Sequence, residues 1–441
     1  MANIKVNFNN CIGNIKPMNA VNNGPIIARK DQSRGNDDAF RAARIPYART
    51  HDSSAYAGYG GAHTVEIQAV FPNFDADVND PASYDFIVTD KYVSNIQSVG
   101  TKVYYRLGTK IEHGVKKYDI FPPKDNQKWA EICEHIIAHY TEGWADGFHY
   151  DMEYWEIWNE PDLDPDERPM NEHRCWGGTS KQFYEFFAVA AKHLKSRYPN
   201  LKIGGPAMAK LQYEGKWFED FLIYMKENNV PMDFFSWHVY SATVEKIEDR
   251  AAYIRQRLDH YGYSATESIL NEWNYVRGWS EDFIYSIEQI ISQKGAAFTA
   301  AVMSACQNSS VDMLMYYDAR PTVFNGLFDF YTLRPLKGYY PFYYFGKLTD
   351  MEKQAEALSD DADIRLTAAS DGERAGVMIS YFAEPDDATS KEISLTLDLG
   401  GRYKLYTTDA DNTNEESIIE VSAGEPVALC LKPQTIIYLE K

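Results

Sequence analysis

The stretch Tyr154-Trp155-Glu156-Ile157-Trp158-Asn159-Glu160-Pro161 is typical of a buried β-strand that ends in a carboxylic acid. Tyr, Trp and Ile in close succession favour the pleated surface of a strand, and Pro161 lacks the backbone donor that further pairing requires. We therefore expect the strand to stop at Glu160 and to present its carboxyl group at the carboxyl edge of a sheet. In a barrel of alternating strands and helices, that edge carries the chemistry. The octet alone leaves open that Glu160 only caps a helix or pairs with an arginine.

A second stretch has the same form. Ser268-Ile269-Leu270-Asn271-Glu272-Trp273-Asn274 is an apolar strand followed by an acid among aromatic and amide side chains. It lies about three strand–helix units after the first. Two strand-end acids on one barrel rim form the pair that cleavage of a glycosidic bond needs.

The chain between and around these stretches alternates apolar strands with amphipathic helical segments. One such helix opens at Asp125 and repeats its apolar residues at intervals of three and four. The eight strands that we predict are 15–22, 43–52, 101–107, 154–160, 201–206, 233–240, 268–274 and 311–318. This order predicts an α/β fold, a (β/α)₈ TIM barrel over residues 1–348. The segment 56–90 is predicted to be a long irregular connection.

The pattern changes near residue 350. Residues 351–363 are charged and lack aromatic side chains, which predicts a solvated connector. Short alternating strands follow at 375–381, 393–399, 427–431 and 436–439, separated by turn residues. We expect a small β-sandwich over residues 349–441. Ile4–Phe8 also alternates, and the first ten or so residues are expected to pair either with the barrel or with this sandwich.

Composition excludes some classes of function. The formal net charge of −20 argues against nucleic acid as a partner, and no apolar run is long enough to span a membrane. Five scattered cysteines show no zinc-site spacing, and we expect no metal and no cofactor. The first residues, MANIKVNFNN, do not resemble a signal peptide. The expectation is a cytoplasmic protein, or a secreted or periplasmic one if a signal has been removed; the oligomeric state stays unknown.

Cleavage of an acetal needs a proton for the leaving oxygen and a nucleophile or a water for the anomeric carbon. The two acids must therefore differ in protonation. Glu160, between Trp158 and Pro161, has the more apolar local sequence and suits the acid/base role. Glu272 has more potential donors around it, including Tyr240 on the neighbouring strand, and suits the anion. His238 and Tyr240 point the same way by the two-residue alternation of a strand.

The chain resembles glycoside hydrolase family 39, within clan A. The likeness rests on Trp158-Asn159-Glu160-Pro161, on 202–206 (KIGGP), on 236–240 (SWHVY) and on 271–274 (NEWN). That family contains retaining β-xylosidases and α-L-iduronidases. The resemblance implies that Glu160 is the acid/base, that Glu272 is the nucleophile and that Asn159 binds the sugar 2-hydroxyl. It also implies that His51, His238 and Tyr240 line the sugar subsite.

Two positions depart from the family pattern. Asn271 stands before the nucleophile where the family usually has Thr. Strand 311–318 offers Tyr316, Tyr317 and Asp318 where clan members commonly place a Trp, so Tyr316 and Asp318 are predicted to contact the substrate. The second departure bears on which sugar is bound rather than on the type of reaction.

The leading hypothesis is a retaining glycoside hydrolase that acts by double displacement at the ends of xylose- or arabinose-containing glycans. One alternative is an enzyme for uronic-acid glycans, with Arg277 and Arg320 gripping the sugar carboxylate. The other is a sugar-binding relative with little or no turnover. In each case the expected partner is an oligosaccharide or glycan.

Overall fold

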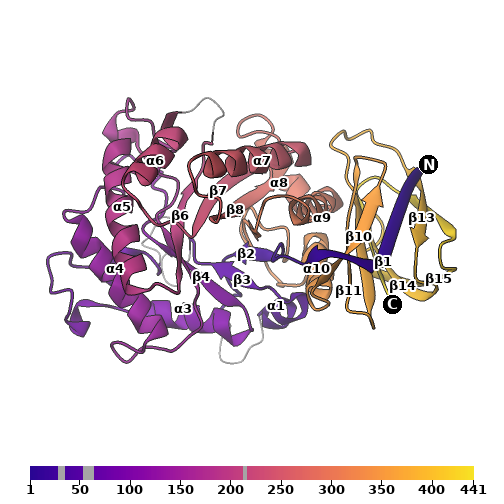
Figure 1. The fold of residues 1–441 in the computed structure, drawn as a ribbon, viewed down its shortest axis with the longest axis horizontal. Coiled ribbons are helices and arrows are strands. Elements are labelled where there is room, and N and C mark those ends of the chain that lie inside the picture. The colour runs from indigo at the N-terminus through magenta and orange to yellow at the C-terminus, as the bar shows by residue number, and fades with distance from the viewer. Residues whose placement is uncertain (28–34, 53–63, 212–215) are drawn as a thin grey trace.

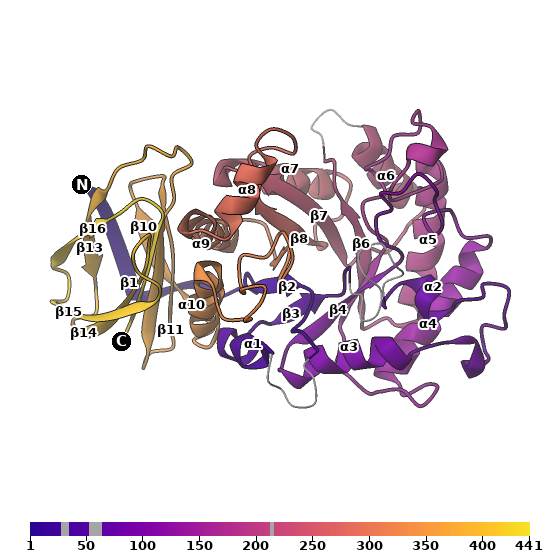
Figure 2. The same ribbon diagram turned by 180° about the vertical axis from the view of Figure 1, so that it is seen from behind.

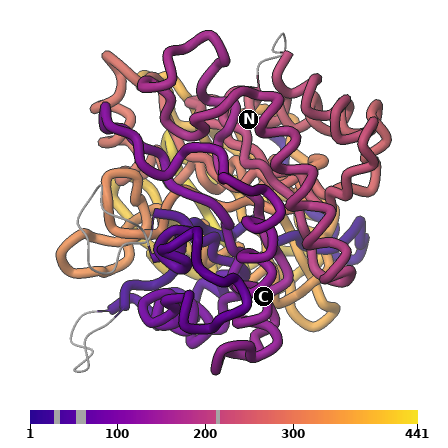
Figure 3. The backbone as a smooth tube through the Cα atoms, turned by 90° about the vertical axis from the view of Figure 1, so that its left-hand side faces the viewer, coloured from indigo at the N-terminus to yellow at the C-terminus, as the bar shows by residue number. Residues whose placement is uncertain are grey.

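The computed structural model describes residues 1–27, 35–52, 64–211 and 216–441. A barrel surrounded by helices lies beside a second sheet, and both chain ends lie on the side of that sheet (Figure 1). Figure 2 gives the opposite view, with α9 and α10 between the barrel and the sheet. Seen from the barrel side, the orange and yellow strands of the second sheet lie behind it (Figure 3).

The predicted eight-stranded parallel barrel is confirmed. Each strand pairs in parallel with the next, and the last pairs with the first through Ala20 and Met315. The barrel strands are β2 (Ala20–Asn22), β3 (Tyr47–Arg49), β4 (Lys102–Leu107), β5 (Tyr154–Ile157), β6 (Lys202–Met208), β7 (Phe234–Ser241), β8 (Glu267–Tyr275) and β9 (Met313–Tyr316).

Helices cover the outside of the barrel, and their starts follow from local sequence. Asp125 accepts hydrogen bonds from two backbone amides at the start of α4, and Thr179 with Gln182 forms a capping box at the start of α5. The helices are α1 (Asp37–Ala43), α2 (Ile67–Val70), α3 (Ile87–Ser98), α4 (Asn126–Thr141), α5 (Ser180–Arg197), α6 (Lys216–Glu227), α7 (Val244–His260), α8 (Phe283–Ile290), α9 (Gln293–Gln307) and α10 (Tyr340–Thr349), with short 3₁₀ turns at Pro81–Ser83, Met170–Glu172 and Lys337–Tyr339. Among the residues described, none of these helices combines the length and apolarity that crossing a lipid bilayer requires.

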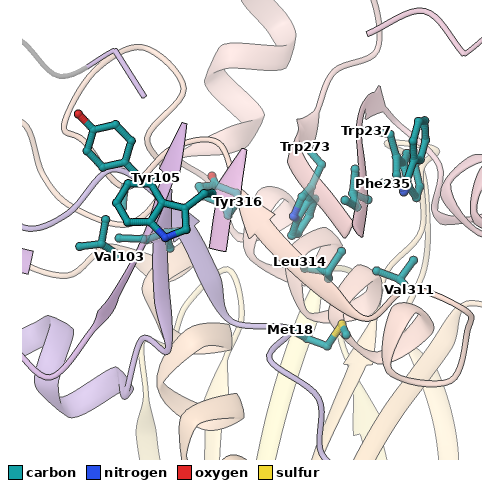
Figure 4. Close-up of a cluster of buried hydrophobic side chains, with 14 of the residues drawn as sticks. Met18, Val103, Tyr105, Phe235, Trp237, Trp273, Val311, Leu314 and Tyr316 are labelled. Carbon is teal, nitrogen blue, oxygen red and sulfur yellow. The ribbon is translucent and has the colours of Figure 1, made fainter. Parts of the chain in front are cut away.

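Alternation along each strand divides the apolar side chains between two cores. Outward residues such as Val103, Phe235 and Leu314 pack between strands and helices, as Figure 4 shows. A small inner cluster that includes Tyr104, Phe234 and Met315 fills the barrel itself. The barrel is therefore a packed core that ends where inward polar side chains begin.

The second sheet has nine strands and contains the start of the chain. Its order is β15-β14-β17-β12-β11-β10-β1-β13-β16. The strands are β1 (Ala2–Asn14), β10 (Lys353–Ser359), β11 (Ile364–Ser370), β12 (Ala375–Tyr381), β13 (Lys391–Leu397), β14 (Gly401–Thr408), β15 (Glu415–Val421), β16 (Pro426–Leu431) and β17 (Thr435–Glu440). β1 pairs with β10 and β13, so the first residues join this sheet rather than the barrel. Ile4, Val6 and their partners bury a common apolar core.

Several predicted bounds are corrected. The predicted strands 15–22 and 43–52 shrink to three residues each, because Ala43 ends α1 and only 47–49 pair. The predicted connector 351–363 contains β10, whose Gln354 and Ala355 are buried against the barrel and the sheet core. The segment 56–90 holds α2 and the start of α3, as far as its residues are described. The boundary between residues 348 and 349 stays a prediction and falls at the end of α10.

A cluster of ion pairs around the buried Lys294 joins the barrel helices to the loop that follows β12 of the second sheet. Lys294 at the start of α9 is 3% exposed and donates to Asp386 at 2.7 Å and to the Glu384 backbone oxygen at 2.5 Å. Arg277, after β8, binds both Glu384 oxygens at 2.8 and 3.1 Å and lies over the ring of Tyr285. The contact between the two sheets is therefore held by charge as well as by the apolar faces of α9 and α10.

We expect Lys294→Ala to lower the free energy of unfolding by about 2–3 kcal/mol, because it removes a buried cation from acidic partners. Urea denaturation monitored by circular dichroism measures this change. Lys432→Ala is the control, since Lys432 is 47% exposed and pairs with Asp411 at the surface, and it is expected to cost less than about 1 kcal/mol. Equal effects of the two substitutions would contradict a stabilising role for the cluster.

Candidate active site

Glu160 lies just after β5, at the carboxyl edge of the barrel. The strand was predicted to end at Glu160 but ends at Ile157. It stops earlier because Trp158 and Glu160 adopt left-handed backbone angles (φ 72° and 50°). The Glu160 amide donates to the Ala207 backbone oxygen at 2.9 Å. Such angles are costly for side chains of this size and are found where surrounding structure holds them. The turn aims the Glu160 carboxyl group into the barrel mouth, where it is 14% exposed.

Glu272 lies within β8, which pairs with β7 in the barrel. Tyr240 donates to its Oε1 at 2.7 Å, and Arg49 approaches its Oε2 at 3.4 Å. His51 Nε2 lies 3.5 Å from the same Oε2 atom. Glu272 therefore faces several donors, of which Tyr240 was predicted from the sequence, whereas Asn271 and Asn274 beside it donate to other groups.

The two acids meet at one point. One oxygen of Glu160, one nitrogen of His238 and one oxygen of Glu272 all lie within 4.8 Å of one another. His238 Nδ1 is 2.9 Å from Glu160 Oε1 and 3.6 Å from Glu272 Oε2. This is the only such group of three possible metal ligands among the described residues. The absence of a metal stays a prediction.

Burial sets the acidity of this group. It raises the pKa of Glu160 to about 7 and that of Glu272 to about 7, and it lowers the pKa of His238 to about 4. At neutral pH the imidazole is therefore neutral and the two carboxyl groups share close to one proton. The donors decide its place: Tyr240 and Arg49 stabilise Glu272 as the anion, which leaves the proton on Glu160.

Arg49 on β3 organises the floor of the site. Its guanidinium is fully buried and donates to Glu156 Oε2 at 2.7 Å and to Asn159 Oδ1 at 2.7 Å. It also donates to Asn22 Oδ1 at 3.1 Å, besides its contact with Glu272. One cation thus connects side chains from four strands of the barrel, among them Glu272 and the residue that precedes Glu160.

The wall opposite Glu160 is formed by the ends of β3 and β9. Tyr317 donates to Asp52 at 2.6 Å, and its ring contacts those of His51 and Tyr240. Asp318 is fully buried and accepts from the Arg320 amide at 2.7 Å and from its guanidinium at 3.1 Å. Asp318 therefore holds Arg320 at the rim, and Arg320 in turn donates to the Asp52 backbone oxygen at 2.5 Å.

Tyr316 does not lie where the sequence predicted. It is 2% exposed and packs outside the barrel against Trp273 and Phe342, and Figure 4 shows it with Trp273 in the outer core. The one-residue alternation of β9 turns Tyr316 outward and Tyr317 inward. Tyr317 therefore takes the place that the prediction gave to Tyr316.

Arg277 also does not lie where the prediction of a uronic-acid site requires it. Its guanidinium is bound to Glu384 of the second sheet, so it does not face the paired acids. Arg320 does reach the rim, but Asp318 and Asp52 already occupy it. The two arginines therefore offer no common grip for a sugar carboxylate.

The sequence analysis did not identify Arg49, Glu156, Tyr317 or Cys175 as site residues. The signal for Arg49 and Glu156 was present: each is a charged residue at an inward position of a barrel strand, and burial there demands a partner. Cys175 comes from a loop, and its thiol lies 3.8 Å from Glu160 Oε2. Burial raises the pKa of that thiol well above its usual range. Nothing in the local sequence predicts this contact.

Comparison with known proteins places this geometry in context. The model of "Glycosyl hydrolases family 39" matches residues 60–279, which include both acids. A β-xylosidase of Geobacillus stearothermophilus is 24% identical over 351 residues, which are 71% of this chain and 65% of that protein. A β-xylosidase of Caldicellulosiruptor saccharolyticus is 27% identical over 168 residues, 36% of this chain and 31% of that protein. The chain thus spans less than two thirds of these relatives.

Solved structures resemble it along its whole length. A glucosidase from Croceicoccus marinus has a TM-score of 0.80 at 25% identity, over 100% of this chain and 98% of that one. A monomeric β-xylosidase from Caulobacter crescentus has a TM-score of 0.72 at 16% identity, over 100% and 99%, and shares the fold. The matched model, the sequence relatives and the shared barrel with its second sheet agree: residues 60–279 of the chain belong to glycoside hydrolase family 39.

Proposed function

We propose that this protein is a retaining glycoside hydrolase that cleaves glycosidic bonds by double displacement, with Glu160 as acid/base and Glu272 as nucleophile. The observation that carries the proposal is the approach of the two acids to within 4.8 Å. Retaining enzymes keep their carboxyl groups ~5–5.5 Å apart, whereas inverting enzymes need ~6.5–9.5 Å to admit a water. A spacing this short favours direct attack by a carboxylate.

In the first step, Glu160 donates its proton to the glycosidic oxygen as the bond between that oxygen and the anomeric carbon breaks. The bonding electron pair leaves with the oxygen, and the Glu272 carboxylate forms a bond to the anomeric carbon from the opposite face. Burial serves this step because it keeps Glu160 protonated at neutral pH, while Tyr240 and Arg49 orient Glu272 as the anion.

In the second step, the Glu160 carboxylate removes a proton from a water whose oxygen attacks the anomeric carbon. The ester bond to Glu272 breaks, its electron pair returns to the carboxylate, and the sugar leaves with its original configuration. Tyr240 donates to the Glu272 oxygen that regains negative charge, which lowers the barrier to this departure.

Side-chain atoms in the barrel mouth that are not bound to other protein groups are the ones that can contact the sugar. Arg49 occupies the oxygen of the Asn159 amide, so its nitrogen is the atom that can donate to a sugar 2-hydroxyl. His51 lines the same barrel mouth, and Asp318 contributes to it by holding Arg320 at the rim. Trp279 is 61% exposed and its ring contacts that of Tyr240 at 5.0 Å, which offers a flat surface to a further sugar ring.

We propose an exo-acting enzyme for β-xylosides or α-L-arabinosides. The β-xylosidase relatives support the pentose, and the glucosidase similar in structure makes a β-glucoside the natural comparison substrate. The pairing of Arg277 with Glu384 removes the feature that favoured a uronic acid.

A panel of nitrophenyl glycosides tests the function. We expect hydrolysis of the β-xyloside or the α-L-arabinoside, with ¹H NMR showing retained configuration in the first product. We expect Glu272→Ala to lose roughly 10⁴-fold in kcat and to recover turnover with azide, giving a glycosyl azide of inverted configuration. Glu160→Ala with azide is expected to give the retained azide, since azide then attacks the glycosyl-enzyme.

The exposed Glu373, in the second sheet, provides a matched control. Glu373→Ala is expected to keep wild-type rates on every glycoside. Sugar binding without hydrolysis of any glycoside would contradict the proposal and favour a binding protein. Inverted configuration in the wild-type product would contradict the double displacement but not the hydrolase activity.

The buried acid predicts a pH-dependent cost in stability. The pKa of Glu160 rises from 4.5 to about 7 on folding, so the folded state binds more protons between these pH values and stability falls as pH rises through that range. Glu160→Gln removes this loss. Thermal unfolding should show the variant matching wild type near pH 4.5 and exceeding it at pH 8, by on the order of 1–3 kcal/mol. Glu373→Gln should differ from wild type equally at both pH values; a Glu160→Gln difference that does not change with pH would oppose the raised pKa.

A further inference from the structure

Asn271 lies between two buried partners, and its orientation is fixed by one of them. Its Nδ2 donates to Glu156 Oε1 at 2.5 Å. The same oxygen accepts from Ser236 at 2.6 Å, while the other Glu156 oxygen is paired with Arg49. A carboxylate paired in this way only accepts hydrogen bonds. The amide must therefore turn its nitrogen to Glu156 and its oxygen away from it.

The oxygen of Asn271 is turned away from Glu156, and Asn271 lies on β8, which pairs with the strand β7 that carries His238. Asn271 is fully buried. Burial lowers the pKa of His238, and the Asn271 side chain opposes this shift, as a nearby hydrogen-bond acceptor does. His238 is 1% exposed and uses Nδ1 to reach Glu160, so Nε2 is the atom left for Asn271. Nε2 of His238 and the Asn271 oxygen are both buried, and neither has a hydrogen-bond partner among the described residues, so a proton on Nε2 aimed at this oxygen would give each of them one. A neutral imidazole carries one proton, and this arrangement places it on Nε2.

We propose that Asn271 is a positioning residue that fixes His238 as the Nε2–H tautomer, so that Nδ1 accepts a hydrogen bond from Glu160 and selects its protonated form. The chain of contacts runs from Arg49 through Glu156, Asn271 and His238 to Glu160. Its kinetic consequence rests on the proposed function; the tautomer itself does not.

The tautomer acts at both steps of turnover. Before the first step, the Nδ1 lone pair stabilises the acid form of Glu160 that the leaving oxygen needs. After proton transfer the same lone pair faces a carboxylate, which repels it and strengthens Glu160 as the base that takes a proton from water. With a proton on Nδ1 instead, His238 would stabilise the anion and weaken both roles.

Other charges act on Glu160 but do not change when Asn271 is substituted. The titratable and charged groups that face it are Arg49 and Asp52 from the end of β3, Asp162, Arg174 and Cys175 from the loop after β5, His238 from β7 and Glu272 from β8. A change in the acidity of Glu160 in an Asn271 variant therefore reports on the contact with His238.

The kinetic test compares Asn271→Leu with wild type on a glycoside with a poor leaving group. The alkaline limb of kcat/KM reports the acid that must be protonated, and we expect it to move about one pH unit lower, with KM nearly unchanged. On a dinitrophenyl glycoside, whose leaving group needs little protonation, Asn271→Leu should lower kcat/KM at alkaline pH much less. Asn271→Thr, whose hydroxyl can donate to Glu156 and accept from His238, should restore the limb.

Asn274→Leu is the matched control on the same strand, because Asn274 is equally buried but donates only to backbone oxygens of Tyr317 and Phe324. We expect it to change rates without moving the alkaline limb. An unmoved limb in Asn271→Leu, or an equal movement in Asn274→Leu, would overturn the proposal.

A second measurement needs no turnover and observes the tautomer in the wild-type protein. In ¹⁵N-histidine-labelled wild-type protein, NMR distinguishes the two neutral tautomers, and the His238 signals are assigned by their loss in His238→Asn. We expect a protonated Nε2 and an unprotonated Nδ1. A proton on Nδ1 would overturn the proposal, whether or not any glycoside is hydrolysed.

Discussion

A single buried guanidinium carries most of the order in the barrel mouth. Arg49 has no exposed surface, yet it binds Glu156 and Asn159 and approaches Glu272. An unpaired charge in such a place costs several kcal/mol, so its partners are held as strictly as the cation itself. Because those partners come from β5 and β8, which are not adjacent to β3 in the barrel, pairing them fixes how distant strand ends lie relative to one another. The positions of the two candidate catalytic acids at these strand ends are fixed in the same way.

The same constraint divides two chemically equal acids. Glu272 faces Arg49, Tyr240 and His51, whereas Glu160 faces a neutral histidine and a thiol. Burial alone would protonate both, and mutual repulsion would protonate only one of them. The placement of donors decides which one, and it does so before any substrate arrives. Preorganised donors of this kind cost no rearrangement during the reaction.

The fold was largely predictable, because long apolar strands and amphipathic helices carry their periodicity in the sequence. The short strands β2 and β3 were overestimated, since three paired residues leave little pattern to read. The helices α1, α3 and α10 were missed, and β10 was taken for a connector because its exposed face is charged. Both acids, His51, His238, Tyr240 and Asn159 come together as their strand-end positions predicted. The prediction for Tyr316 was wrong because the face of the barrel to which its side chain points depends on where β9 begins, and the sequence does not mark that position. Cys175 and the grip of Glu384 on Arg277 depend on segments that only the folded chain brings together.

The account is tested most directly by trapping the covalent intermediate. An activated 2-deoxy-2-fluoro glycoside of the hydrolysed sugar should react once, because fluorine slows both steps while a dinitrophenyl leaving group speeds the first. Peptide mass spectrometry should then find one sugar bound to the peptide containing Glu272, and no label in Glu272→Ala. A label on Glu160, or inactivation without any covalent label, would contradict the assignment of the two acids on which the account depends.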